Sequence, residues 1–482
     1  MATEDNFIVA IELGSSKVTA IAGRKQPDGA IQVLAFAQER SSSFIRKGRI
    51  NNISKMTQCI SGMKEKLEKK LQKTISRAYV GIGGMGMHTV GNTVTRHFPA
   101  KTIVEQDVID SILAENLDAQ SGERVILDTV PQEFKLGTQV TNEPVGISAE
   151  SIEGHYLNVL ANASVGEDIR NCFRNAGIGI AGMPITVQVL ADIILTEPEK
   201  RSGCVFVDMG SETTSVLVYK NNILRHLAVI PLGGANINRD ISSLQIEDDE
   251  AETLKIKYGS ALRNEDEAES SPIFLQDGRQ VKFEEFSGLV EARMEEIILN
   301  VNNQISLSNY DKSQLIGGLV VTGGAANIKD IEKAFERYTG FEKLRFVKNV
   351  RLQLRTSGKE LADFNADGSC NAAISIIDKA ELNCCGGDLG SSTPDIFLEE
   401  EERKKREEAE RLARDKREQE EREAREREEA ERLAREEEER RRKERRFKGI
   451  KKMFGKVSDM ARKMVTDDEG PYTSEEKKDS EK

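Results

Sequence analysis

The 482-residue chain lacks three features that would assign it to the membrane, to the secretory route or to a zinc-binding class. No apolar run reaches ~18 residues, which excludes a transmembrane helix. The first residues carry no basic segment, so we expect no secretory signal. Six scattered cysteines form no C-x-x-C pair, which is typical of reduced thiols. These absences predict a protein that is made and kept in the cytoplasm.

The C-terminal part of the chain has too few apolar residues to build a core. Residues 399–446 contain 21 acidic and 19 basic residues out of 48. The motif Ala-Glu-Arg-Leu-Ala-Arg occurs at 409–414 and again at 430–435, a period of three heptads that puts both leucines on one helix face. The pattern predicts an isolated, highly charged helix. A weak coiled coil is the alternative.

A short basic segment, residues 447–465, follows the charged stretch. Its apolar residues form one helical stripe, and lysines flank them. The stripe contains Ile450, Met453, Phe454, Val457 and Met464, and the lysines are Lys451, Lys452 and Lys456. This pattern predicts a helix in an anionic membrane interface. A nucleic-acid-binding tail and a protein-docking helix are the alternatives, and the scarcity of aromatic residues disfavours nucleic acid. Residues 466–482 are predicted to be disordered.

Three segments in the first 330 residues each read as a buried strand that runs into a glycine turn. They span residues 7–17, 204–214 and 319–327. Glycine allows the backbone to turn tightly and approach a ligand, and the neighbouring hydroxyl and N–H groups can cradle phosphate oxygens. Two such turns facing each other, with a third for the nucleoside, would clamp ATP between two halves of the protein.

The order of these turns resembles the superfamily of actin, sugar kinases and heat-shock chaperones, and within it the FtsA family of bacterial cell-division proteins. Segments 131–134, 142–146, 231–240 and 250–259 add to the resemblance, which covers roughly residues 5 to 380. It implies an α/β fold: an actin-like ATPase of two lobes, with an α+β insert in the first lobe. The charged helix and the amphipathic helix follow this core.

The same resemblance and the local patterns predict the domain boundaries. The first lobe comprises residues 1–83 and 165–203, and residues 84–164 form the insert between them. The second lobe comprises residues 204–365, with a helical subdomain at about 240–312. Residues 366–382 form a helix that returns to the first lobe, and residues 383–398 form a linker.

The resemblance also implies which residues bind the nucleotide. One phosphate loop supplies Gly14, Ser15, Ser16 and Lys17, and the other supplies Gly210, Ser211, Thr213 and Thr214. Glu252 and Lys255 match a pair that contacts ribose and adenine, although an exposed ion pair within one helix is the alternative. The nucleoside side is completed by Gly233, Gly234, Asn236, Gly323, Gly324 and Asn327.

Glu12 and Asp208 are the implied acids that hold the water shell of Mg²⁺. The loops depart from the family pattern, since Glu12 replaces an Asp, Ser211-Glu212 replaces Gly-Gly, and Ser215 stands where an Asp often occurs. Glu212 would either repel a γ-phosphate or face solvent. Gln188 resembles a glutamine that orients the attacking water, or is merely solvated. We therefore expect at most a slow ATPase in which the nucleotide is an assembly switch.

The implied function is that of a division adaptor on the cytoplasmic face of the cell membrane at the division site. It would form filaments, bind an anionic membrane surface and anchor the tubulin-like protein FtsZ, without binding nucleic acid. The acidic C-terminal segment of FtsZ would dock near Arg293, unless that residue is a surface arginine paired with Glu296. A PilM-like actin homologue and a small-molecule kinase are the alternatives.

Overall fold

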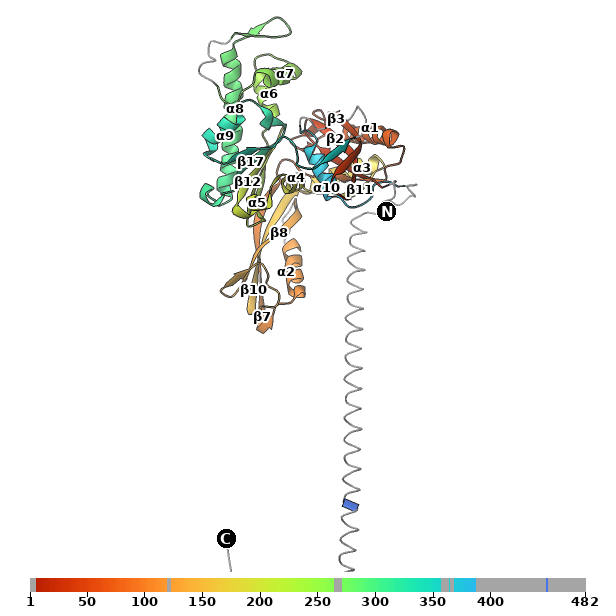
Figure 1. The fold of residues 1–482 in the computed structure, drawn as a ribbon, viewed down its shortest axis with the longest axis vertical. Helices are drawn as coiled ribbons and strands as arrows, with labels where there is room; N and C mark the ends of the chain where they lie inside the picture. Colours follow the sequence, from red (N-terminus) through yellow and green to blue (C-terminus); the bar gives the residue numbers. More distant parts are fainter. Residues whose placement is uncertain are drawn as a thin grey trace, which may run out of the picture. The chain divides into compact units, whose positions relative to one another are not determined.

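The computed structural model describes residues 6–118, 123–263, 271–356, 364, 368–386 and 448–449. The chain divides into two compact units, residues 1–396 and 397–482, and all elements discussed below belong to the first unit. Within this unit two lobes and an insert are visible (Figure 1).

The first lobe is built on a six-stranded sheet of order β11-β6-β1-β2-β3-β19. Its strands are β1 (Ile8–Leu13), β2 (Lys17–Lys25), β3 (Ile31–Arg40), β6 (Arg77–Val80), β11 (Gly179–Gly182) and β19 (Leu354–Thr356). A small hairpin, β4 (Ile45–Arg46) and β5 (Arg49–Ile50), follows β3. The helices are α1 (Ile53–Leu71), α3 (Ala163–Asn175), α4 (Thr186–Ile194) and α10 (Asn371–Lys379).

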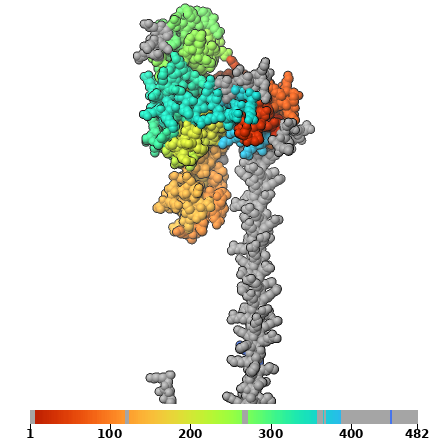
Figure 2. Space-filling view, viewed as in Figure 1, coloured from red at the N-terminus to blue at the C-terminus, as the bar shows by residue number. Residues whose placement is uncertain are grey.

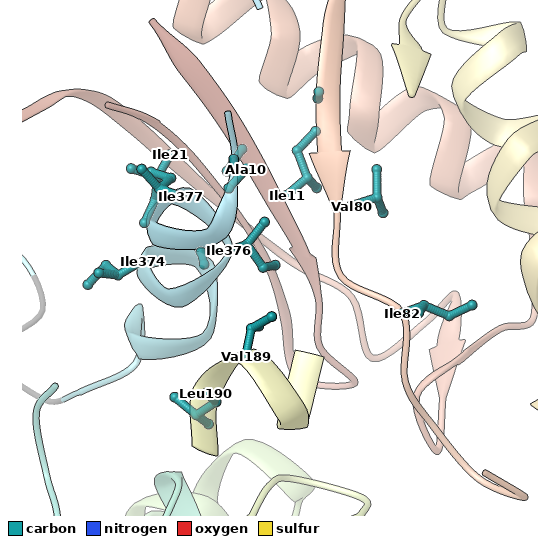
Figure 3. Packing of buried hydrophobic residues seen from close by; sticks show 14 of the residues in the cluster. Ala10, Ile11, Ile21, Val80, Ile82, Val189, Leu190, Ile374, Ile376 and Ile377 are labelled. Carbon is teal, nitrogen blue, oxygen red and sulfur yellow. The ribbon is translucent and has the colours of Figure 1, made fainter. Parts of the chain in front are cut away.

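Helix α10 packs on this sheet and against α4 through aliphatic side chains (Figure 3). Ile374, Ile376 and Ile377 of α10 and Leu190 of α4 are buried. Ile21 on β2 is buried in the same cluster. Burying each of these side chains contributes on the order of 1.5–3 kcal/mol. Helix α10 therefore packs on the hairpin β1–β2, which carries the first phosphate loop, and supports it.

The second lobe shares its sheet with the insert, in the order β18-β17-β12-β13-β14-β7-β10-β8-β9. Its own strands are β12 (Cys204–Met209), β13 (Thr214–Lys220), β14 (Ile223–Ile230), β17 (Gly318–Thr322) and β18 (Leu344–Phe346). Its helices are α5 (Glu197–Ser202), α6 (Gly234–Ser242), α7 (Asp248–Tyr258), α8 (Phe283–Leu307) and α9 (Ile331–Thr339), with a short hairpin of β15 (Ile273–Phe274) and β16 (Gln280–Val281).

Strand β12 is buried on both faces. Val205 and Val207 join the second-lobe core, whereas Cys204 and Phe206 join the core that continues into the first lobe. Strand residues alternate between faces, so a continuous apolar run can serve two cores at once. This explains why the strand before the second phosphate loop is so hydrophobic.

The insert consists of β7 (His88–Ile103), α2 (Gln106–Asp118), β8 (Arg124–Leu136), β9 (Gln139–Thr141) and β10 (Ser148–Asn162). It protrudes below the second lobe, in orange (Figure 2). Its sheet meets the second lobe at one residue pair, Ala228 on β14 with His88 on β7. The insert thus interrupts the sequence of the first lobe but extends the sheet of the second.

The structure differs from the sequence-based boundaries in two further places. Strand β19 lies inside the range predicted for the second lobe, yet it pairs in parallel with β3 of the first lobe. Strand β11 and the β15–β16 hairpin were not expected, because each is short and carries no alternating pattern. The other boundaries remain predictions.

Several predicted segments lie outside the described residues. These are the charged helix 399–446, all eight residues assigned to the membrane stripe and its lysines, the tail 466–482 and most of the linker 383–398. Among the described residues, no helix has the length and apolar content needed to cross a bilayer.

Candidate functional site

A cavity of about 600 Å³ is lined by residues of both lobes, including the turns of two hairpins. The β1–β2 turn contributes Gly14 to Lys17 from the first lobe. The β12–β13 turn contributes Gly210, Ser211 and Thr213 from the second. In the two hairpins Glu12 pairs with Thr19 and Asp208 pairs with Ser215, so each acid occupies the same place in its hairpin.

The first phosphate loop is fixed by the residues that follow β3. The Ser41 hydroxyl donates to the Gly14 carbonyl at 2.6 Å, and the Ser41 N–H donates to the Ser16 carbonyl at 3.0 Å. A side chain at Gly14 would lie 2.6 Å from the Lys17 carbonyl and 3.0 Å from a Glu12 carboxylate oxygen. Glycine is therefore required for the backbone to turn beside the acid.

The second phosphate loop is fixed by the start of α6. The N–H of Gly234 donates to the Gly210 carbonyl at 3.0 Å, and the N–H of Ala235 donates to the Ser211 carbonyl at 2.7 Å. A Cβ at Gly233 would lie 2.5 Å from the Gly210 oxygen. This close approach explains why two glycines precede α6.

Glu12 and Asp208 both line the cavity and are otherwise enclosed by protein. Burial, followed by the nearby charge of Asp208, raises the pKa of Glu12 to about 8, and Lys17 partly opposes this increase. Burial raises the pKa of Asp208 to about 6. Two carboxyl groups that resist ionisation side by side are suited to share a cation. Within the described chain no three His, Cys, Asp or Glu side chains cluster into a metal site.

The far wall of the cavity comes from α7 and from the turn after β17. The Lys255 ammonium donates to Glu252 at 2.7 Å and to the Gly234 carbonyl at 3.3 Å. The ion pair predicted as the alternative is thus present, and both residues also line the cavity. Gly323 has φ +99°, and a Cβ there would lie 2.7 Å from an Asp208 oxygen.

Most of the residues predicted to bind the nucleotide meet in this cavity. Those lining it are Gly14, Ser15, Ser16, Lys17, Asp208, Gly210, Ser211, Thr213, Gly234, Glu252, Lys255, Gly323, Gly324 and Asn327. Three predicted residues are not among the lining residues. The Thr214 hydroxyl points the other way and donates to the Leu232 carbonyl at 2.8 Å, because it alternates with its cavity-facing neighbours. Gly233 packs on the second loop, and Asn236 accepts from the Gly233 N–H at 3.0 Å.

Glu212 follows neither of its predicted orientations. The residue is 3% exposed, so its side chain does not face solvent. It is also absent from the cavity wall, so it does not face a γ-phosphate there. Its carboxylate is held by Arg46, Arg239 and the N–H of Lys47. The local sequence does not show these partners, which come from distant parts of the chain.

Gln188 and Arg293 both have partners that the sequence did not indicate. Gln188 donates to Asp128 of the insert at 3.2 Å and does not line the cavity. Arg293 makes two hydrogen bonds to Asp240 on α6, at 2.6 and 3.0 Å, and also pairs with Glu296. The water-orienting role of Gln188 and the docking role of Arg293 stay predictions.

Sequence analysis missed several parts of the wall. Gly48, Gly83 and Gly84 come from the first lobe, while Lys348 and the segment before and at the start of α10 add Gly368, Ser369, Asn371 and Ala372. A Cβ at Gly368, where φ is +74°, would lie 2.0 Å from the Lys348 carbonyl. The small-residue run before α10 was a usable signal for this contact.

Comparison with known proteins finds similarity to one family. A family model described as Cell division protein FtsA matches residues 205–367. The Cell division protein FtsA of Porphyromonas gingivalis is 27% identical over 347 residues, covering 70% of this chain and 72% of the relative. That of Neisseria meningitidis is 26% identical over 343 residues, covering 70% and 83%. This chain is similar to the FtsA family of cell-division proteins.

A solved structure, the PilM-PilN type IV pilus biogenesis complex, supports the same fold. It is similar with a TM-score of 0.54 at 13% identity, covering 77% of this chain and 97% of the solved one. At that identity the similarity establishes the fold alone. The predicted actin-like, two-lobed α/β architecture is confirmed.

Proposed function

We propose that this FtsA-like protein binds ATP with Mg²⁺ and acts in cell division as a membrane-bound adaptor for FtsZ. The observation that carries the ATP part is the pair of opposed phosphate loops, each with an acid at the same hairpin position, around one cavity. Hydroxyl and backbone N–H groups of the loops would bind phosphate oxygens. Glu252, Lys255 and the Gly323–Asn327 turn would hold the nucleoside.

The residues present fit a hydrated magnesium ion. Mg²⁺ keeps several waters and takes one or two protein carboxylates, which Glu12 and Asp208 can supply. When bound, the ion would neutralise phosphate charge and orient the phosphate oxygens. In return, a cation between the two acids would favour their ionised forms, which burial opposes.

The composition of the cavity wall supports an adaptor over a small-molecule kinase. Among the described lining residues the acids are Glu12, Asp208 and Glu252. The wall beyond the two loops is mostly apolar, with Ile50, Met87, Val165, Ile169, Val187, Leu190 and Val229. A kinase would need a base there to activate a substrate hydroxyl. With Gln188 also outside the wall, we propose slow turnover and a switching role for the nucleotide.

The remaining parts of the proposal rest on sequence pattern and family. The stripe and lysines of residues 447–465 support attachment to the anionic cytoplasmic face of the membrane. The surface of α8 around Arg293 is the proposed dock for the acidic C-terminal segment of FtsZ. An incoming carboxylate would have to replace Asp240 on the arginine. Self-assembly into filaments at the division site completes the proposal.

Titration calorimetry tests the ATP site directly. We expect the parent to bind ATP in the presence of Mg²⁺, and Asp208→Ala to weaken binding at least tenfold, about 1.4 kcal/mol. Asp277→Asn, in the exposed β15–β16 hairpin, is the control and should bind like the parent. The difference should shrink when EDTA removes the metal. A parent that binds no nucleotide, or an Asp208→Ala variant with unchanged affinity, would refute the site.

A further inference from the structure

The carboxylate of Glu212, in the second phosphate loop, is buried and accepts three hydrogen bonds. Arg46 Nη1 donates to Oε1 at 3.1 Å, and Arg239 Nη2 donates to the same oxygen at 2.6 Å. The backbone N–H of Lys47 donates to Oε2 at 2.6 Å. The side chain is 4% exposed, so its charge depends on these donors rather than on water.

The three donors come from different lobes. Arg46 and Lys47 belong to the β4–β5 hairpin of the first lobe, whereas Arg239 lies on α6 of the second. Glu212 itself is in the second lobe, so two of its hydrogen bonds cross between the lobes. Another pair across the lobes, Arg40 with Asp249, has side chains that are 82% and 85% exposed. Solvent screens that pair strongly, whereas the Glu212 carboxylate is buried, although Arg46 and Arg239 are 55% and 48% exposed.

The hairpin that holds Glu212 also holds the first phosphate loop. At its turn Lys47 and Gly48 have φ +50° and +73°. This left-handed geometry points the Gly48 N–H at the Ser15 hydroxyl, which accepts it at 2.8 Å. The Lys47 carbonyl in turn accepts the N–H of Met85 at 2.8 Å. One turn of the first lobe is therefore bonded to Ser15 in one phosphate loop and to Glu212 in the other.

We propose that Glu212 is a positioning residue that latches the two lobes together and sets how fast the nucleotide leaves. Separating the lobes to release a ligand from between the phosphate loops strips the buried Glu212 carboxylate of two of its three donors and leaves Arg239 as its remaining partner. That step slows opening even though Glu212 does not line the cavity. The inference rests on the proposed nucleotide site and adds the control of its release.

Stopped-flow release of a fluorescent ADP analogue, with Mg²⁺ and excess unlabelled ADP, measures this latch. We expect Glu212→Gln to speed release roughly tenfold, because the amide leaves the two arginines without a counter-charge. Arg46→Met removes the partner on the first lobe and should speed release by a similar factor. Glu291→Gln is the matched control, since this acid is 15% exposed and pairs with Arg263 inside the second lobe.

The double variant Arg46→Met/Glu212→Gln separates a latch from general loosening. If the two residues act through one contact, the double variant should release no faster than the faster single variant. Thermal melting without nucleotide identifies any variant that fails to fold. If Glu212→Gln does not fold, Arg46→Met alone still tests the contact between the lobes.

Each outcome has a distinct meaning. Folded variants that bind the analogue but release it at the parental rate would overturn the latch and leave the nucleotide site intact. Fully multiplicative effects in the double variant would also overturn it. A parent that binds no analogue would overturn the proposed nucleotide site and, with it, this role of Glu212.

Discussion

Glu12 is the residue whose protonation depends most on its surroundings in the cavity. Burial and the neighbouring Asp208 raise its pKa to about 8, although Lys17 opposes them. In the absence of a bound cation the carboxyl group therefore keeps its proton through neutral pH. The longer side chain found here in place of aspartate does not prevent this, since Glu12 still reaches the cavity.

This raised pKa predicts a pH-dependent stability for the nucleotide-free protein. The folded state binds more protons than the unfolded state between the ordinary pKa of 4.5 and about 8. The Glu12 contribution to the free energy of unfolding therefore falls as pH rises through this window, by up to about 1.4 kcal/mol per pH unit. Glu12→Gln has no proton to lose, so its stability relative to the parent should increase with pH.

Urea unfolding from pH 5 to pH 8.5, without nucleotide or Mg²⁺, measures the difference. Glu65→Gln, an exposed acid on α1, is the control and should follow the parent. A gap between parent and Glu12→Gln that stays constant with pH would show that Glu12 is ionised throughout.

At the scale of single elements, α2 of the insert is anchored by a buried polar network. Asn116 is fully buried and exchanges two hydrogen bonds with Asn158 on β10, at 2.9 and 3.0 Å. It also accepts from Asn92 on β7 at 2.9 Å. The network fixes the register of the helix against two strands.

Asn116→Ala should therefore destabilise the insert by about 1–3 kcal/mol, because the buried side-chain N–H of Asn158 loses its acceptor. We expect faster hydrogen exchange at the amides of α2, and parental exchange at β12 and β17 in the second lobe. Leu117→Ala, its exposed neighbour on the same helix, should leave exchange nearly unchanged. Uniformly faster exchange across the whole protein would mean that the insert does not unfold separately.

The face of α8 that carries Arg293 gives a second prediction at this scale. Arg293→Glu should abolish binding of a labelled FtsZ C-terminal peptide in fluorescence anisotropy, because the charge that would pair with a carboxylate is reversed. Asp240→Asn should strengthen binding, since it weakens the competing pair. Arg279→Glu on the nearby hairpin serves as the control. Normal binding by Arg293→Glu would place the dock elsewhere.

The elements also show what the sequence can and cannot predict. The phosphate loops were predictable because each is a local pattern, an apolar strand followed by a glycine turn. The contacts of Glu212 were not, since Arg46 and Arg239 approach it only after the lobes fold. Lys348 and Asn371, which line the cavity, were missed for the same reason. The strand pairing of β7 with β14 comprises one residue pair, supported by hydrogen bonds between Thr89 and Leu227, and leaves no sequence pattern.

At the scale of the whole molecule, membrane attachment should depend on two separable contributions from residues 447–465. Phe454→Glu puts a charge in the middle of the apolar stripe and should abolish flotation with anionic liposomes at any salt concentration. Lys451→Ser/Lys452→Ser should weaken binding at low salt, by about 1 kcal/mol per lysine. Its effect should fade near 1 M salt, where the Debye length is ~3 Å.

Deleting the residues after Arg446 removes the whole segment predicted to bind the membrane. The truncated protein should remain in the soluble fraction while still binding nucleotide, since the cavity residues precede residue 373. Flotation that survives the deletion would mean that another surface contacts the lipid.

Because the insert is attached to both lobes, a small rotation at its base produces a larger movement at its far end. Its chain continues into the first lobe at both ends, whereas its sheet meets β14 of the second lobe through the pair Ala228 and His88 and through hydrogen bonds of Thr89 and Gln132. Strand β7 has 16 residues and is thus ~50 Å long. A hinge rotation of ~5° at its base would therefore sweep its far end through ~4 Å. Closing of the lobes would therefore displace a neighbouring molecule bound at that tip by a distance comparable to the spacing of two strands.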